Sequence, residues 1–230
     1  MTQATFLPTG RRRPITGASV AIALAAAAVL YGIGIALLIA MPTDSATAGV
    51  AQYLVAGLAP LLAVAIVLFS RVHDLPALGI RSVAPRWIFI AIGAGVGVIV
   101  LNILIALGVV LLLGPLDDIQ TDYAAAASGG PALLLLTLLA GAVLTPVGEE
   151  WLFRGVVTNW LLRFGGWVAV PVSAAIFAVS HGINLILPVA FVVGVITALL
   201  FRATASIWPG VIVHASYNGY SIVADALVGG

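Results

Sequence analysis

The chain has 230 residues, of which 63% are hydrophobic and only 7% are charged. Soluble domains carry about 25% charged residues, so this composition excludes a soluble globular protein and indicates a polytopic membrane protein. The formal net charge of +1 argues against nucleic-acid binding, and the lack of cysteine excludes disulfides, zinc–thiolate sites and cysteine nucleophiles.

About seven apolar segments follow one another along the chain, and each is expected to cross the roughly 30 Å of hydrocarbon as a helix. No alternating strand pattern competes with them, so the predicted fold class is all-α, a polytopic transmembrane helix bundle. The first segment is too long for the apolar core of a signal peptide, which has about 7 to 15 residues, and is expected to be an uncleaved helix. The expected spans are residues 15–40, 50–69, 88–113, 131–147, 167–181, 185–200 and 209–227.

Two segments between these spans have a distinct composition. Residues 151–164 are less apolar and contain Arg154 and Arg163, so we expect an interfacial elbow after the fourth span or the cytoplasmic end of that helix. Residues 114–130 form the longest exterior segment, for which a plain connecting loop is expected and a lid is the alternative.

The connections are too short for independent domains, so residues 1–230 are predicted to form a single integral membrane domain. Within it, residues 1–130 supply N-terminal helices and residues 131–230 supply the motif-bearing catalytic helices. All nine basic residues are arginines, and a cytoplasmic N-terminus places every one of them on the cytoplasmic side, as the positive-inside rule requires. The predicted location is a bacterial cell membrane with the N-terminus in the cytoplasm. The aspartates expected on the other side are Asp44, Asp117, Asp118, Asp122 and Asp225.

Glycine and proline suggest two local features. Gly93, Gly95 and Gly97 in the third span are expected to form a small-residue face that packs within the molecule, with a dimer contact as the alternative. Pro146, just before two glutamates, is expected either to kink the fourth helix and free carbonyls toward them or to bend the helix without a chemical role.

Ionisable side chains within the spans gather in three clusters. Each such residue costs about 2.5–3.5 kcal/mol on insertion scales, so each needs a structural or chemical reason. The clusters are GEEWLFRG at residues 148–155, FAVSH at residues 177–181 and HASYN at residues 214–218. Taken singly, each could be an interfacial ion cluster or polar helix-to-helix contact; the combination on three helices favours a functional site.

The first cluster separates its two carboxylates. On a helix, Glu150 and Arg154 lie one turn apart and can pair, while Glu149 points about 100° away. One carboxylate is thus held by the arginine, and the other can face the interior of the bundle.

The residue types are compatible with two mechanisms of hydrolysis. A desolvated carboxylate can take a proton from water, an imidazole can relay it, and His and Asn donors can stabilise an oxyanion. Two His, a Glu and an Asn could alternatively ligate a divalent metal such as zinc, which would generate hydroxide. The metalloprotease signature HExxH and the serine-hydrolase signature GxSxG are both absent from the sequence, so a zinc site would be non-standard.

The three motifs EExxxR (residues 149–154), FxxxH (residues 177–181) and HxxxN (residues 214–218) resemble those of the CPBP family of intramembrane proteases. That family includes the CAAX prenyl endopeptidases and bacteriocin-processing and immunity relatives in bacteria. The resemblance covers about residues 131–225. The roles it implies are general base for Glu149, help in activating the water for His181, oxyanion stabilisation for His214 with Asn218, and support for Glu150 with Arg154.

The expected function is therefore an intramembrane endopeptidase that cleaves a membrane-associated or hydrophobic peptide or protein. Its site is expected at the inner boundary of the membrane, opening toward the cytoplasmic half. A prenylated substrate is not assumed, and the motifs specify neither a metal nor an oligomeric state. One alternative is a non-enzymatic scaffold or bacteriocin-immunity protein that binds a peptide or partner in the same polar pocket. Another is a small transporter, which lacks support because no inverted repeat is present.

Overall fold

The structure is a computed structural model that describes residues 15–40, 44–114 and 120–228, and every regular element in these ranges is helical. The predicted all-α, polytopic bundle is confirmed. Five helices in the described part are long and apolar enough to cross a membrane, so the chain is an integral membrane protein. The predicted positions of Arg11, Arg12, Arg13, Asp117 and Asp118 lie outside the described residues.

The first two spans form an antiparallel hairpin. Helix α1 is Gly17–Ala40, and helix α2 (Ser45–Val67) continues through the π-helical turn η1 (Leu68–Val72). Asp44 caps α2 by accepting a hydrogen bond from the Thr47 amide at 2.8 Å, and this bond holds the pKa of the Asp44 carboxyl below its usual range.

A short 3₁₀ turn, η2 (Pro76–Leu78), leads to helix α3 (Pro85–Leu113), which has Pro85 in its first turn. Little of the apolar surface of α3 is buried, so most of this helix faces lipid. The exterior segment after it contains one helix that the sequence did not predict, α4 (Thr121–Ser128). Asp122 of α4 accepts hydrogen bonds from Ser45 and Gln52, which fixes α4 against the beginning of α2.

The fourth span is one continuous helical segment, Pro131–Phe164. The expected interfacial elbow at residues 151–164 is wrong, because this segment continues the fourth helix to its end. Two of its polar side chains are buried in the bundle, since Arg154 and Thr158 have no exposed surface, whereas Arg163 near its end is exposed. The segment comprises α5 (Pro131–Thr137), η3 (Leu138–Leu144), α6 (Thr145–Glu150), η4 (Trp151–Thr158), α7 (Asn159–Leu161) and η5 (Leu162–Phe164), of which η3 and η4 are π-helical.

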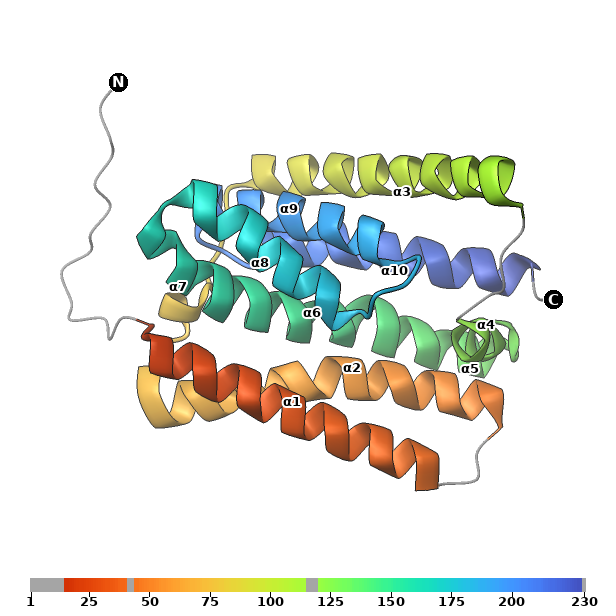
Figure 1. Cartoon of the computed structure of the whole chain (residues 1–230), viewed down its shortest axis with the longest axis horizontal. Coiled ribbons are helices and arrows are strands. Elements are labelled where there is room, and N and C mark those ends of the chain that lie inside the picture. Colours follow the sequence, from red (N-terminus) through yellow and green to blue (C-terminus); the bar gives the residue numbers. More distant parts are fainter. Residues whose placement is uncertain (1–14, 41–43, 115–119, 229–230) are drawn as a thin grey trace.

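Of the three remaining helices, only Leu187–Thr204 is among the five that are long and apolar enough to cross a membrane, whereas about seven such spans were predicted. Helix α8 (Gly166–Ser180) has 15 residues and is about 22 Å long, which is too short to cross 30 Å of hydrocarbon. Helix α9 (Leu187–Thr204) returns beside it, so the α8–α9 connection lies part-way along the bundle (Figure 1). Helix α10 (Trp208–Val228) then runs toward the opposite end.

Figure 1 shows the long fourth helix, labelled α6 and α7, between the α1–α2 hairpin and the layer formed by α8, α9 and α10. Helix α3 lies on the outer side of α10, against which it packs. The fourth helix therefore contacts both halves of the bundle, and residues at its middle are shielded from lipid on two sides.

The close approach of α2 to α6 depends on two glycines. A Cβ atom on Gly148 would lie 2.2 Å from the carbonyl oxygen of Gly57, and one on Gly57 would lie 2.7 Å from the Leu144 side chain. By contrast, a Cβ on Gly93 or Gly97 would meet nothing within 4 Å. The predicted packing face of α3 is thus wrong for Gly93 and Gly97. It holds for Gly95, which approaches Ser216 of α10.

Candidate active site

Glu149 and Glu150 lie in the middle of the fourth helix. Glu149 is the nineteenth of the 34 residues in Pro131–Phe164, so the helix continues about 22 Å beyond it. The prediction that Glu149 lies at the inner end of the fourth helix is therefore wrong. The polar residues after it suggested the end of a span, but Glu150, Arg154 and Thr158 have no exposed surface.

Pro146 and the π-helical segment before it expose a backbone carbonyl to the site. In the i→i+5 pattern of η3, the Thr145 N–H donates to the Ala140 carbonyl. The next hydrogen bond in this pattern would run from the backbone nitrogen of Pro146 to the Gly141 carbonyl. Proline has no N–H, so the Gly141 carbonyl is left free within the helix. Asn218 of α10 donates to it through Nδ2 at 2.9 Å. Of the two predictions for Pro146, the one that it frees a carbonyl toward the site therefore holds. That carbonyl orients Asn218.

Glu150 and Arg154 form a buried, bidentate ion pair. Arg154 Nε lies 2.9 Å from Glu150 Oε2, Arg154 Nη2 lies 3.2 Å from Oε1, and neither side chain is exposed. The guanidinium also stacks on the ring of Phe177, 4.8 Å from its centroid. A buried charge pair with this geometry removes the arginine from any chemistry and fixes the orientation of the Glu150 carboxylate.

Glu149 faces the interior, as its 100° offset from Glu150 predicts. Its side chain is 7% exposed, and its Oε2 atom makes no hydrogen bond to any described protein group. Two imidazole nitrogens flank this oxygen: His181 Nε2 at 3.5 Å and His214 Nε2 at 3.9 Å. A buried carboxylate oxygen with two nitrogen neighbours just beyond hydrogen-bond distance is an arrangement that a water molecule can bridge.

His181 is placed by the end of α8. The helix stops there because Gly182 adopts a φ of +89°, a left-handed conformation that favours glycine. His181 Nδ1 lies 2.9 Å from the Phe177 carbonyl, which can only accept, so Nδ1 carries the proton. In the neutral ring, Nε2 then presents a lone pair toward Glu149.

His214 lies between the two glutamates. Its Nε2 faces Glu149, while its Nδ1 is 3.5 Å from Glu150 Oε1, and the side chain is 5% exposed. Gly210, one turn earlier in α10, permits this proximity, because a Cβ there would lie 2.5 Å from Glu150 Oε2. Glu150 therefore connects the arginine to the His214 ring.

Phe177 contacts three of the polar groups, although the sequence assigned it no role beyond its motif. Its ring is 1% exposed and lies 4.6 Å from the His181 ring and 5.7 Å from the His214 ring, centroid to centroid. Arg154 covers it as described above. The phenyl ring thus packs against the guanidinium and against both imidazoles.

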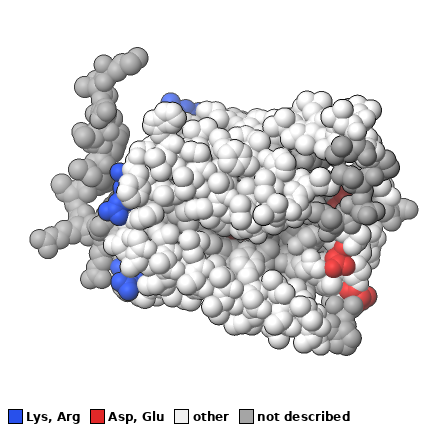
Figure 2. Space-filling model, in the orientation of Figure 1, with Lys and Arg blue, Asp and Glu red and all other residues white. Residues whose placement is uncertain are grey.

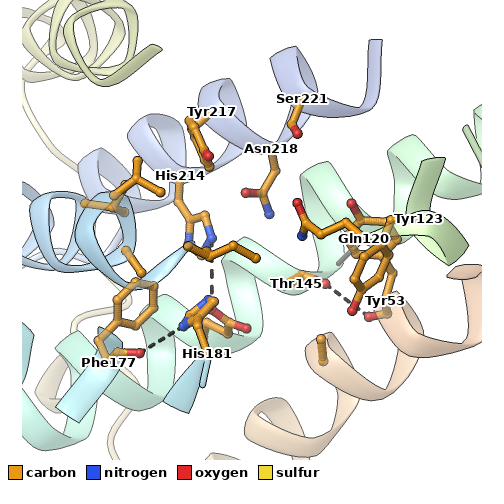
Figure 3. A pocket seen from close by; sticks show the side chains of 16 residues that line it. Tyr53, Gln120, Tyr123, Thr145, Phe177, His181, His214, Tyr217, Asn218 and Ser221 are labelled. Atoms are coloured by element: carbon orange, nitrogen blue, oxygen red, sulfur yellow. Dashed lines mark hydrogen bonds and ion pairs between the residues drawn. The ribbon is translucent and has the colours of Figure 1, made fainter. Parts of the chain in front are cut away.

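Two cavities meet at Glu149. The inner pocket, of about 120 Å³, extends along α10 past Tyr217 and Asn218. Figure 3 shows His181 and His214 facing each other across this pocket, with Asn218 beside them. The second cavity, here called the groove, has about 610 Å³ and lies between α1, α2, the start of α4 and the α8–α9 connection. Figure 2 shows this face of the molecule hollowed between its two layers of helices.

The structure brings together all six residues that the sequence predicted for the site. Glu149, His181, His214 and Asn218 line the inner pocket, and Glu150 and Arg154 lie directly behind it. Sequence reasoning missed the opposite wall, made by Tyr53, Gln120, Tyr123, Thr145 and Ser221 (Figure 3).

Only part of that wall has a sequence signal. Ser221 continues the 214, 217/218, 221 spacing of one helix face, which a helical period would find. The contribution of α4 has no such signal, because it depends on the contacts of Asp122 with α2. Burial raises the pKa of Tyr123 to about 12, so this phenol stays protonated, and able to donate a hydrogen bond, well into the alkaline range.

The geometry gives no support to the zinc alternative. Across residues 15–40, 44–114 and 120–228, no three or more His, Asp or Glu side chains are grouped so that they could hold a metal ion. The described side chains can instead bind and deprotonate a water molecule themselves, through Glu149, His181, His214 and Asn218.

The family comparison identifies the same region. Residues 131–220 match a family model described as type II CAAX prenyl endopeptidase Rce1-like. This range contains all three motifs and begins at the first residue of the fourth helix. Neither the curated proteins nor the solved structures contain a match to the chain.

Proposed function

Because residues 131–220 match the CAAX protease family model, we propose that the chain is an intramembrane endopeptidase that hydrolyses a peptide bond in a membrane-associated or hydrophobic substrate. One observation carries the proposal. The buried Glu149 Oε2 lies 3.5 Å and 3.9 Å from the Nε2 atoms of two histidines, at the junction of two cavities.

The first step is activation of a water molecule between Glu149 and His181. The water donates one hydrogen bond to Glu149 Oε2 and the other to the lone pair of His181 Nε2. The water oxygen attacks the carbonyl carbon of the scissile peptide bond, and the proton passes to the Glu149 carboxylate. The product of this step is a tetrahedral intermediate with a negative oxygen.

Asn218 and His214 stabilise that oxygen. One N–H of Asn218 is engaged by the Gly141 carbonyl, which leaves the second N–H for the oxyanion. His214 contributes from the same helix face, one turn earlier, when Nε2 carries a proton. Donors fixed in a water-poor site act before the charge develops, so little reorganisation accompanies the reaction.

The intermediate collapses when the carbon–nitrogen bond breaks. Glu149 returns its proton to the departing amine, which leaves a new amino terminus and a new carboxyl terminus. Glu150 and Arg154 touch no reacting atom in this scheme; they position His214 from behind. The proposed setting is a bacterial cell membrane with the N-terminus in the cytoplasm.

The test compares membrane and exported peptides by mass spectrometry in cells that produce equal amounts of wild type or Glu149→Gln. The amide keeps the size of the side chain but cannot act as the base, so specific precursors should accumulate and their products should disappear. A scaffold or immunity protein would bind its partner with either side chain. Identical peptide sets, together with a phenotype that does not depend on Glu149, would establish that alternative.

A further inference from the structure

The groove occupies one half of the molecule, the half with the aspartates. The residues of α1 that line it, Tyr31 to Ile39, lie in the second half of that helix, and those of α2, Ala48 to Ala56, lie in the first half. Both stretches lie toward the end of α1 and the beginning of α2. That is the end of the bundle where Asp122 binds Ser45 and Gln52 of α2.

Neither of the two cavities at Glu149 extends to the arginine end of the molecule. Beyond Glu149 in that direction, η4 is packed into the core: Leu152, Val156 and Val157 are at most 1% exposed. Neither the inner pocket nor the groove has an arginine among its lining residues. Figure 2 shows arginine side chains at one end of the molecule and acidic side chains at the other, so the groove and the basic end lie apart.

Orientation in the membrane follows from the same charges. The positive-inside rule places the end that carries Arg71, Arg81 and Arg163 in the cytoplasm. The acidic half, with the groove, then lies in the outer half of the bilayer. This assignment differs from the sequence-based expectation that the site opens toward the cytoplasmic half.

The walls of the groove fit an extended, apolar polypeptide. Ile35 and Ile39 of α1 are 53% and 81% exposed at its lipid-facing wall, where they can contact aliphatic side chains. Gln52 and Asn184 bring amide groups to the groove. Their NH₂ groups donate one hydrogen bond each, to Asp122 and to the His181 carbonyl, and the second N–H of each is left for a backbone in hydrocarbon, which needs such partners. With no arginine in the lining, the groove offers no guanidinium to a terminal carboxylate, which favours an internal segment over a free C-terminus.

We propose that the substrate reaches Glu149 through this groove from the non-cytoplasmic half of the membrane, as an extended, uncharged internal segment of an exported or membrane-spanning protein. The substrate class rests on the proposed endopeptidase function. The side of the membrane from which the groove is open does not depend on that function.

The absence of cysteine from the sequence makes the side directly measurable. Ser180→Cys places a thiol in the groove beside His181, and Ala48→Cys places one nearer its acidic end. Ser70→Cys is the matched control, since Ser70 is exposed and precedes Arg71. Intact cells that produce each full-length variant are treated with a membrane-impermeant maleimide, before and after permeabilisation.

The expected result is labelling of Ser180→Cys and Ala48→Cys in intact cells and of Ser70→Cys only after permeabilisation. The opposite pattern would overturn the assignment of sides. Labelling of Ala48→Cys but not Ser180→Cys would show that the groove does not lead to the site, and would overturn the route. These readouts need no hydrolysis and should be the same with Glu149→Gln, so they can fail independently of the proposed function.

A second measurement tests the occupant. In the Ser180→Cys, Glu149→Gln protein, an uncharged Leu- and Ala-rich peptide with both ends blocked should suppress labelling of the thiol. The same peptide with a free carboxyl end should protect it less. Equal labelling with and without the blocked peptide would overturn the proposed substrate class, while equal protection by both peptides would overturn the preference for an internal segment.

Discussion

Arg154 illustrates the difference between a group that supports the site and one that would react in it. Its guanidinium has no exposed surface and is held by the Glu150 carboxylate and the Phe177 ring. Removal of one member of a buried pair leaves the other charge uncompensated, which costs about 3–5 kcal/mol. We therefore expect Arg154→Met to lower the free energy of unfolding by that order, measured by tryptophan fluorescence during thermal denaturation in detergent.

The matched control removes both charges. The double variant Glu150→Met, Arg154→Met should recover most of the lost stability, because no unpaired charge remains. It should not recover activity, because His214 loses the carboxylate 3.5 Å from its Nδ1. If the double variant were as unstable as Arg154→Met, the ion pair would not be the origin of the effect.

Asn218 has a role that is separable from packing. Asn218→Asp keeps the shape of the side chain but removes both N–H groups, one of which binds the Gly141 carbonyl. We expect kcat to fall by about 10²–10³-fold, the usual effect of losing one oxyanion donor, with a much smaller change in KM. Ser221→Ala, one turn further along the same cavity wall, is the control and should retain near wild-type kcat. A large rise in KM with unchanged kcat would assign Asn218 to substrate binding instead.

At the scale of the helices, the contact between α2 and α6 determines where Glu149 lies. The Gly148→Ala change would place a methyl group 2.2 Å from a backbone oxygen of α2, and backbone cannot move as easily as a flexible side chain. Overpacking of this kind costs about 1–3 kcal/mol. We expect the midpoint of thermal unfolding to fall, and activity to fall with it, because the next residue is Glu149.

Gly97→Ala is the control for that change. A Cβ at this position of α3 meets nothing within 4 Å, and alanine in a helix interior is more stable than glycine by about 0.5–1 kcal/mol. The midpoint should therefore stay the same or rise. Equal destabilisation by the two alanines would mean that the α2–α6 contact is not the tight one.

Most helix boundaries were predicted from the sequence, but the end of the fourth helix, and so the position of Glu149 along it, was not. The expected spans at residues 88–113 and 167–181 differ from α3 and α8 by only a few residues, because apolar runs and flanking Gly or Pro mark them directly. The fourth helix was cut short at residue 147, since buried Arg154 looks in sequence like the end of a span. Burial of a charge depends on its partners, which only the folded bundle provides.

At the scale of the whole molecule, the separation of charge predicts the orientation of both termini. Helix α1 begins at the end that carries the arginines, and α10 ends at the opposite one (Figures 1 and 2). Alkaline phosphatase, which is active only outside the cytoplasm, should therefore be active when fused to the C-terminus. Green fluorescent protein fused there should be dark. A fluorescent C-terminal fusion with an inactive phosphatase fusion would reverse the orientation.

The three motifs predicted the six polar residues that meet in the bundle because their order on successive helices resembles one family. The walls of the groove were not predictable in this way. They come from α1, α2 and α4, where the sequence shows only apolar residues and an exterior loop, and they come together through contacts such as Gln52 with Asp122. Long-range contacts of this kind have no local sequence pattern.

The most direct test of the proposed chemistry is the rate of cleavage by purified, membrane-reconstituted wild type and Glu149→Gln, measured with a quenched fluorescent peptide that contains a cleavage site found by the peptide comparison in cells. General-base catalysis typically contributes 10²–10⁴-fold, so kcat/KM should fall by about that factor while the midpoint of thermal unfolding changes little. Equal rates for the two proteins would contradict the assignment of Glu149 as the base.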